Sequence, residues 1–161
     1  MVFEEQIKGL DPRYAVFGSF FGVATKLETV GNCYLEGITS KQWFLLAVLI
    51  TFFKEPPTLG TLASAMGTSH QNAKQIAAKL EQKGFLRLER DASDRRSCRV
   101  ACTQYCHEYA LGHAARDGRF MNDLFKDMKE GEVRELLRLM LKFYQGLENL
   151  KGGDGDDRSD L

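Results

Sequence analysis

TLGTLASAMGTSHQNAKQIAAKLEQKGFLRLERDASDRRSCRVACT, residues 58–103, is the stretch that decides the fold. Its apolar residues recur at helical intervals up to residue 83 and alternate with polar residues from residue 86 onward. Gly84 stands at this change, in the position that a glycine commonly takes just after a helix. The stretch therefore predicts helices followed by a β-hairpin.

The helical half divides into two short helices. Thr58 can cap a helix over residues 59–66, Gly67 predicts a turn, and Ser69 can cap a second helix that runs to about Lys83. The apolar residues of this second helix form one stripe: Ala73, Ile76, Ala77 and Leu80. Two short helices joined by a tight turn indicate a helix-turn-helix.

The alternating half predicts a two-stranded ribbon with one buried face, around a tip with the sequence DASDRR, residues 91–96. The residues expected on the buried face are Leu86, Leu88, Cys98, Val100 and Cys102. A hairpin after a helix-turn-helix makes a winged helix-turn-helix, in which the second helix enters the major groove of DNA. The adjacent Arg95 and Arg96 then lie where a wing tip reaches the narrow groove, whose negative potential attracts arginine.

Two helices are expected before this stretch. Asp11 and Pro12 begin the first, whose apolar residues have helical spacing: Val16, Phe17, Phe20, Phe21, Ala24 and Leu27. Residues 30–37 are expected to form a loop. Thr39 and Gln42 resemble a capping box that begins the second helix, which is expected to be buried and to end near Phe53.

Two more helices are expected after it. Thr103 can cap a long helix with a break near Gly118, and a last helix covers about Glu130 to Leu150. The last helix is apolar on two sides: Val133, Leu137, Met140, Tyr144 and Leu147 on one, Leu136, Leu139 and Phe143 on another. A helix that is apolar on two sides needs more partners than a small domain supplies, which favours a dimer interface.

Length and composition indicate one cytoplasmic globular domain. The chain has 161 residues, 43% of them hydrophobic, which suffices for a core. Its longest apolar run, Trp43 to Phe53, is too short to span a bilayer, and the N-terminal sequence does not resemble a secretory signal. The four cysteines include no Cys-x-x-Cys pair, so reduced thiols are expected.

The charges are segregated along the chain. The totals cancel, with 22 basic and 22 acidic residues, but from Ser69 to Arg99 eight basic side chains oppose four acidic ones, which leaves +4. The last ten residues, rich in Gly and Asp, carry −3, and residues 151–161 are expected to be a disordered acidic tail. The basic segment favours nucleic acid as a partner.

From about residue 38 to residue 150, the sequence resembles the MarR family of winged helix-turn-helix transcription regulators. The similarity lies in ITSKQWFLLAVL (38–49), in residues 58–103, and in MKEGEVRELLRLMLKFY (128–144); its most specific part is Asp94-x-Arg96 between Gly84 and Thr103. The resemblance implies a homodimer on a near-palindromic operator, with DNA binding relieved by a small molecule or an oxidant. It divides residues 1–150 into dimerisation helices, about 1–37 and 104–150, and a winged helix-turn-helix, about 38–103.

The sequence departs from the family in two places. The family's Leu-Thr-x-x-Gly after the wing is here Cys102-Thr103-Gln104-Tyr105-Cys106, and the second helix has polar residues where relatives often place an arginine. Gln and Asn read adenine in the major groove, which predicts A·T-rich half-sites about 10 bp apart. The predicted DNA-binding residues are Ser69, His70, Gln71, Asn72, Lys74, Gln75, Arg95, Arg96 and Arg99, with Asp94 as a brace for the wing.

Some residue patterns also have plainer interpretations. Cys98 and Cys102 suit the buried face of a strand, and Cys33 in its loop is the best thiol-sensor candidate, although Glu28 and Glu36 would raise its thiol pKa. Five further residues could line an effector pocket or belong to the core: Phe17, Phe20, Phe21, Trp43 and His113. For each residue taken by itself, a place in the core is favoured.

No motif indicates catalysis, a cofactor or a metal site. The sequence therefore predicts a mainly α protein with a small two- to three-stranded β-wing that dimerises through its N- and C-terminal helices. Its predicted function is that of a transcriptional regulator, with repression favoured. Two alternatives remain: a winged-helix module that binds another protein, and a ligand carrier without DNA function.

Overall fold

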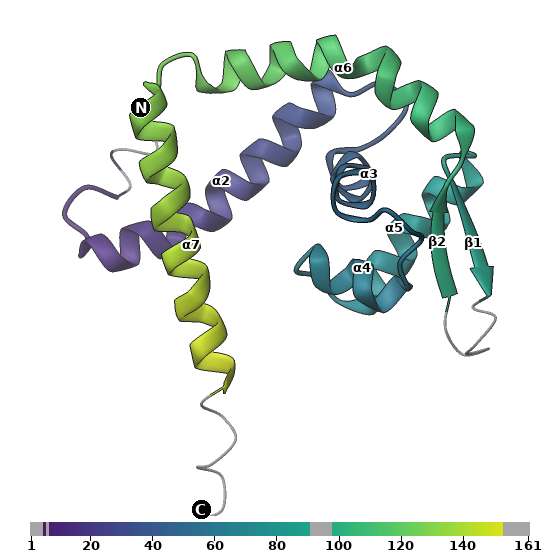
Figure 1. Cartoon of the computed structure of the whole chain (residues 1–161). Coiled ribbons are helices and arrows are strands. Elements are labelled where there is room, and N and C mark those ends of the chain that lie inside the picture. The colour runs from purple at the N-terminus through teal and green to yellow at the C-terminus, as the bar shows by residue number, and fades with distance from the viewer. Residues whose placement is uncertain (1–4, 6, 91–97, 153–161) are drawn as a thin grey trace, which may run out of the picture. The chain divides into compact units, whose positions relative to one another are not determined.

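The computed structural model of the chain describes residue 5, residues 7–90 and residues 98–152. The described residues up to 112 form one compact unit, and those from 113 onward form a second. Figure 1 shows the elements: α2 (Pro12–Tyr34), α3 (Ser40–Phe52), α4 (Leu59–Ala65), α5 (His70–Gln82), β1 (Leu86–Arg90), β2 (Cys98–Cys102), α6 (Gln104–Phe125) and α7 (Glu130–Gly152). The predicted fold, mainly α with a small β-wing in a winged helix-turn-helix, is confirmed.

Polar caps begin the helices where the sequence predicts. The Asp11 carboxylate accepts from the backbone N–H of Arg13 at 2.8 Å, with Pro12 in the first position of α2. At α3, Thr39 Oγ1 accepts from the N–H of Gln42 at 3.3 Å, and Gln42 Oε1 accepts from the N–H of Thr39 at 3.1 Å. This reciprocal capping box satisfies two backbone donors that a helix start otherwise leaves without partners.

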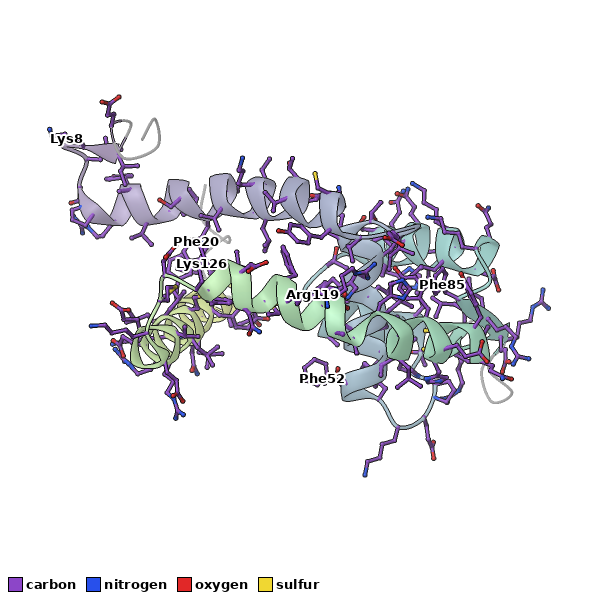
Figure 2. All side chains as sticks on the ribbon, turned by 90° about the horizontal axis from the view of Figure 1, so that it is seen from above. Lys8, Phe20, Phe52, Phe85, Arg119 and Lys126 are labelled. Atoms are coloured by element: carbon purple, nitrogen blue, oxygen red, sulfur yellow. The ribbon has the colours of Figure 1, made fainter. Side chains whose placement is uncertain are left out.

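The core of the first unit lies among α3, α4, α5, the two strands and the first turns of α6. Its most deeply buried side chains are Leu45, Leu62, Leu80, Leu86, Val100 and Cys106. Burial of one such leucine contributes about 1.5–3 kcal/mol. Phe85, labelled in Figure 2, holds α6 on this core, because its ring lies 4.8 Å from that of Tyr105 and 5.0 Å from that of Tyr109.

Helix α3 is buried on one side only. Leu45, Leu46 and Leu49 belong to the core, whereas the rings of Phe44 and Phe52 are exposed, and Figure 2 shows Phe52 projecting from the end of the helix. The prediction of a buried helix therefore holds for one of its faces only. Consecutive apolar residues occupy all sides of a helix, whereas the core of this unit contacts only one side of α3.

Helix α2 is longer than predicted, because residues 30–34 of the expected loop continue it. Gly31 is buried there, and a Cβ added to it would stand 2.5 Å from Ser40 Oγ. The Ser40 hydroxyl uses this space to donate to the carbonyl oxygen of Glu28 at 3.1 Å and contacts Asn32 Oδ1 at 3.0 Å. The glycine thus permits a close approach between two helices and does not end one.

In helix α6, Gly118 does not interrupt the helix, so the predicted break was wrong. One helical glycine costs only about 1 kcal/mol relative to alanine, which a long helix tolerates.

Helix α7 extends to Gly152, two residues beyond its predicted end, and the remainder of the predicted acidic tail lies outside the described residues. Its exposed apolar side chains include Leu136, Leu137, Met140, Leu141 and Tyr144. Among the helices of the described ranges, none has the length and hydropathy that crossing a membrane requires.

Candidate nucleic-acid interface

A tight turn sets α5 against α4. Gly67 adopts a left-handed conformation, with φ +63°, which a side chain would disfavour. The N–H of Gly67 donates to the carbonyl oxygen of Ser64, and that of Thr68 donates to the carbonyl oxygen of Ala63, each at 3.0 Å. Ser69 then caps α5 by accepting from the N–H of Asn72 at 3.2 Å. These bonds make the predicted turn of the helix-turn-helix.

Helix α5 has one apolar side and one polar side. The predicted stripe is buried against the core: Ala73, Ile76, Ala77 and Leu80. The opposite side of its N-terminal half is exposed and carries the side chains of His70, Gln71, Asn72, Lys74 and Gln75. The structure thus brings the predicted residues of this helix together on one outward face, beside the capping Ser69.

Thr68 orients one of these side chains. Its Oγ1 accepts from Nδ2 of Asn72 at 2.8 Å, so the amide nitrogen of Asn72 faces Thr68. This bond uses one N–H of Nδ2. Thr68 was missed by the sequence analysis, although a threonine just before a helix cap is a plain signal for such local bonds.

Two long-range bonds fix the C-terminal end of α5. Lys83 Nζ donates to the carbonyl oxygen of Gly37 at 2.6 Å and to Oε1 of the buried Gln42 at 3.1 Å. On the strand side, Oε1 of Glu81 accepts from the N–H of Leu88 at 2.8 Å. The helix is therefore held both to the start of α3 and to the wing. The sequence offered no signal for these contacts between distant residues.

Strands β1 and β2 pair antiparallel, as predicted for the wing. Leu86 faces Cys102, Leu88 faces Val100, and Arg90 faces Cys98 as the last pair before the tip. The tip itself, residues 91–97, lies outside the described residues, and with it the predicted Asp94, Arg95 and Arg96. The described part of the wing fixes the two points from which the tip extends.

Arg99 is partly buried and pairs with Glu89, one position before the last pair of the wing. Its Nη1 donates to the carbonyl oxygen of Pro56 at 2.9 Å, and a single β-bridge joins it to Thr58. The neighbouring N–H of Val100 donates to the carbonyl oxygen of Pro57 at 2.9 Å. The segment before α4 thus joins the edge of the wing, which accounts for the expected two to three strands. At least one N–H of Arg99 is used within the protein.

Two of the aromatic side chains predicted for the core are exposed. Phe17 and Phe21 lie on the surface of α2, with their rings edge to face at 5.3 Å, so the core interpretation was wrong for both. Trp43 does pack against the core, whereas Phe20 and His113 are partly buried.

The loop interpretation of Cys33 was wrong. This exposed residue lies in the last turn of α2, where Sγ contacts the carbonyl oxygen of Thr29 at 3.4 Å.

Comparisons with known proteins agree with this geometry. Residues 36–97 match the model of the MarR family. Over 142 residues the chain is 25% identical to the transcriptional activatory protein BadR of Rhodopseudomonas palustris, covering 86% of this chain and 81% of BadR. That alignment extends well beyond the winged helix-turn-helix, into the helices on both sides of it.

Two solved structures share the fold at low identity. The S. aureus MepR–DNA complex has a TM-score of 0.72 at 18% identity, covering 80% of this chain and 94% of MepR. The PcaV regulator of Streptomyces coelicolor, in complex with its natural ligand, has a TM-score of 0.67 at 17% identity, covering 76% of this chain and 89% of PcaV. Residues 36–97 thus match the MarR family, and most of the chain shares the fold of these two solved structures.

Proposed function

We propose that the chain is a sequence-specific transcriptional regulator that places the N-terminal half of α5 in the major groove of DNA. The observation that carries this proposal is the two-sided character of α5. Its apolar stripe is anchored in the core, while an uninterrupted group of polar side chains faces outward, close to the helix start. Residues near the start of a recognition helix are the ones that reach base edges.

The exposed side chains suit recognition of base pairs and phosphates. An Asn or Gln amide donates to and accepts from adenine in the major groove, and Lys74 supplies a positive charge for phosphate or guanine. Thr68 leaves one N–H and the Oδ1 of Asn72 available, which is the pair of groups that adenine needs. The proposed contacts on and beside α5 are made by Ser69, His70, Gln71, Asn72, Lys74 and Gln75.

The wing supplies the second set of proposed contacts. We assign Arg95 and Arg96 to the minor groove beside the operator half-site, because arginine is favoured where the groove is narrow. Asp94 would repel phosphate and is assigned to bracing the wing. Arg99 is partly buried, and its bond to Pro56 suits a role in orienting the wing alongside a backbone contact.

The regulator is proposed to act as a homodimer on a near-palindromic operator. Exposed apolar side chains along α2 and α7 support this, because a monomer would leave them in water. MepR is a family member in complex with DNA and PcaV one with a natural ligand, which supports DNA and a small-molecule effector as partners here. We propose a cytoplasmic location and a binding function, not catalysis, because those suit a member of this family.

A matched pair of variants tests the proposal. Gln75→Ala removes a proposed contact, whereas Gln82→Ala removes the same exposed side chain about 10 Å further along the helix. Fluorescence anisotropy on an operator selected from genomic fragments is expected to show roughly tenfold weaker binding for Gln75→Ala, which is about 1.4 kcal/mol, and unchanged binding for Gln82→Ala. Equal affinities for the two variants would contradict the proposed orientation of α5.

Two further outcomes decide between functions. Affinity without salt dependence would favour the protein-interaction module, because phosphate contacts release counterions. A protein that holds a small molecule tightly but has no affinity for DNA would favour the ligand carrier.

The sign of regulation is a separate question. The sequence favours repression, whereas the name of BadR describes an activator. In vitro transcription from the selected operator, with and without the protein, distinguishes the two.

A further inference from the structure

Two cysteine sulfur atoms lie close together where the wing meets α6. Cys102 is the last residue of β2, Cys106 lies in the first turn of α6, and their Sγ atoms are 3.4 Å apart. Both thiols are free; Cys106 is fully buried and Cys102 is partly exposed. The sequence analysis treated Cys102 only as a residue of the buried strand face, and it missed this pair.

Thr103 causes the approach. It is the single residue between the strand and the helix, and its Oγ1 accepts from the N–H of Cys106 at 3.2 Å, which caps α6. The chain therefore turns from strand to helix in one step, so Cys102 comes to lie over the first helical turn. Packing of Tyr105 and Tyr109 on Phe85 holds that turn against the core.

A hydrogen bond joins the two sulfur atoms. A hydrogen bond from the Cys102 thiol stabilises the Cys106 thiolate and lowers the pKa of Cys106, while the same bond, together with burial, raises the pKa of Cys102. In the part of the chain that the structure describes, no third side chain joins them in a metal-binding group.

We propose that Cys102 and Cys106 are a redox-active dithiol, which a peroxide closes to an intramolecular disulfide, and that the closed form binds the operator more weakly. The first half of this proposal stands on the geometry of the sulfurs alone. The second half rests on the proposed DNA-binding function.

The chemistry needs a peroxide as oxidant and yields water. The thiolate of the pair attacks one peroxide oxygen, the O–O bond breaks, and with one proton taken up the products are a sulfenic acid on that cysteine and, from hydrogen peroxide, water. The sulfur of the other cysteine then attacks the sulfur of the sulfenic acid and releases its proton. The S–O bond breaks, and the hydroxyl leaves as a second water with that proton. In total, two thiols lose two electrons and two protons, and the peroxide takes them up.

Closing the disulfide must move the structure around it. The sulfurs have to approach from 3.4 Å to about 2.05 Å. Cys102 pairs with Leu86 in the ladder of the wing, and the intervening Thr103 is bonded to Gly84 just after α5. The contraction therefore acts where the wing, the recognition helix and α6 meet. Because DNA recognition needs α5 and the wing in a fixed relation, we expect at least tenfold weaker operator binding after closure.

The chain offers a direct readout of closure. Trypsin cleaves after Arg99 and after Arg116, so both cysteines fall in one peptide, residues 100–116, while Cys33 and Cys98 fall in others. Full-length protein is treated with hydrogen peroxide, its remaining free thiols are alkylated, and it is digested with trypsin. The masses of the peptides are then measured by mass spectrometry. The expected result is a peptide lighter by two hydrogens and carrying no alkyl group, which dithiothreitol restores. Cys102→Ser and Cys106→Ser abolish this product, whereas the matched variant Cys33→Ser leaves it unchanged.

Operator affinity is measured on the same samples of wild-type protein, before oxidation, after it and after reduction, so that no variant needs to fold. Alkylation of both cysteines after peroxide would overturn the dithiol. Closure with unchanged operator affinity would overturn its regulatory effect. If reduced wild-type protein selects no DNA, the proposed function fails, and the peptide masses still decide whether the dithiol exists.

Discussion

The hydroxyl of Thr103 donates to the carbonyl oxygen of Gly84 at 2.7 Å, which ties the start of α6 to the glycine that follows α5. The N–H of Thr103 also donates to the carbonyl oxygen of Phe85 at 3.0 Å. Gly84 has φ +80°, a conformation that lets the chain leave α5 and enter β1 at once. One side chain thus joins the helix that we place in the groove, the wing and the helix that follows.

The first prediction concerns this hydroxyl. Thr103→Val keeps the shape of the side chain but removes the bond to Gly84 and the cap that accepts from Cys106. We expect the free energy of unfolding to fall by about 1–2 kcal/mol in urea titrations. Thr103→Ser retains the hydroxyl and is the control. Equal losses in the two variants would assign the effect to the methyl group and contradict the role of the bond.

The second prediction concerns Gly31. A methyl group there would stand 2.5 Å from Ser40 Oγ, so Gly31→Ala is expected to destabilise the protein by about 1 kcal/mol, despite the better helix propensity of alanine. Gly112→Ala, in α6, places a methyl group that meets nothing within 4 Å and should be neutral or stabilising.

A double variant isolates the cause. In a Ser40→Ala background the crowding oxygen is gone, so Gly31→Ala should no longer destabilise the protein. Thermal unfolding of the four proteins in this cycle gives the coupling between the two positions. A cost for Gly31→Ala that persists without the Ser40 hydroxyl would contradict the close-approach explanation.

The third prediction concerns the dimer. Leu137 is an exposed apolar residue on α7, and Leu137→Glu would place a charge in the proposed interface. Dimer affinity measured by analytical ultracentrifugation should fall on the order of a hundredfold, which corresponds to about 3 kcal/mol. Lys142→Ala, on the polar side of the same helix, should leave it unchanged. A Leu137→Glu protein that is as dimeric as the wild type would place the interface elsewhere.

The fourth prediction concerns pH. Bonds from the Arg13 side chain and from its backbone N–H lower the pKa of the Asp11 carboxyl below its usual value of 3.8. Because the folded state favours the ionised form, this stabilisation is complete above the pKa of the unfolded chain and is lost as pH falls through the folded pKa. Asp11→Ala should therefore lower the melting temperature at pH 7, and the difference from wild type should shrink below about pH 4.

Asp11→Asn separates the cap from the charge. It keeps a side-chain oxygen that can accept from the N–H of Arg13 but removes the ion pair with the guanidinium, whose Nη2 lies 2.7 Å from Asp11 Oδ2. Its melting temperature should lie between those of the other two proteins at pH 7. A gap between wild type and Asp11→Ala that is the same at pH 7 and pH 2 would show that the carboxylate charge contributes nothing.

The features that the sequence predicted correctly are local ones. Thr39 with Gln42, Ser69 before α5 and Gly84 after it each act on backbone groups within four residues, so their pattern in the sequence is enough to identify them. The alternation from residue 86 likewise identified Leu86 and Val100, which are buried, whereas Leu88, Cys98 and Cys102 of the same predicted face are only partly buried.

The features that the sequence analysis missed depend on residues distant in the chain or on the boundary between a strand and a helix. Gly31 looked like a loop residue because its partner Ser40 lies in another helix. Lys83 reaches Gln42 across 41 positions in the chain. Cys102 was read with the strand and Cys106 with the helix, and only the turn at Thr103 brings their sulfurs together. In the candidate site, the residues of α5 stand on one exposed face as expected. Which base or phosphate each side chain contacts depends on the operator, and the protein sequence does not specify it.

The most direct test is selection of binding sites from fragmented genomic DNA, run in parallel with reduced wild-type protein and with Arg96→Ala. We predict that the wild type recovers an inverted repeat with A·T-rich half-sites about 10 bp apart. Arg96→Ala, still dimeric, should recover it at least tenfold less. Failure of the wild type to enrich any sequence would contradict a sequence-specific regulator, and equal enrichment by both proteins would contradict the wing contact.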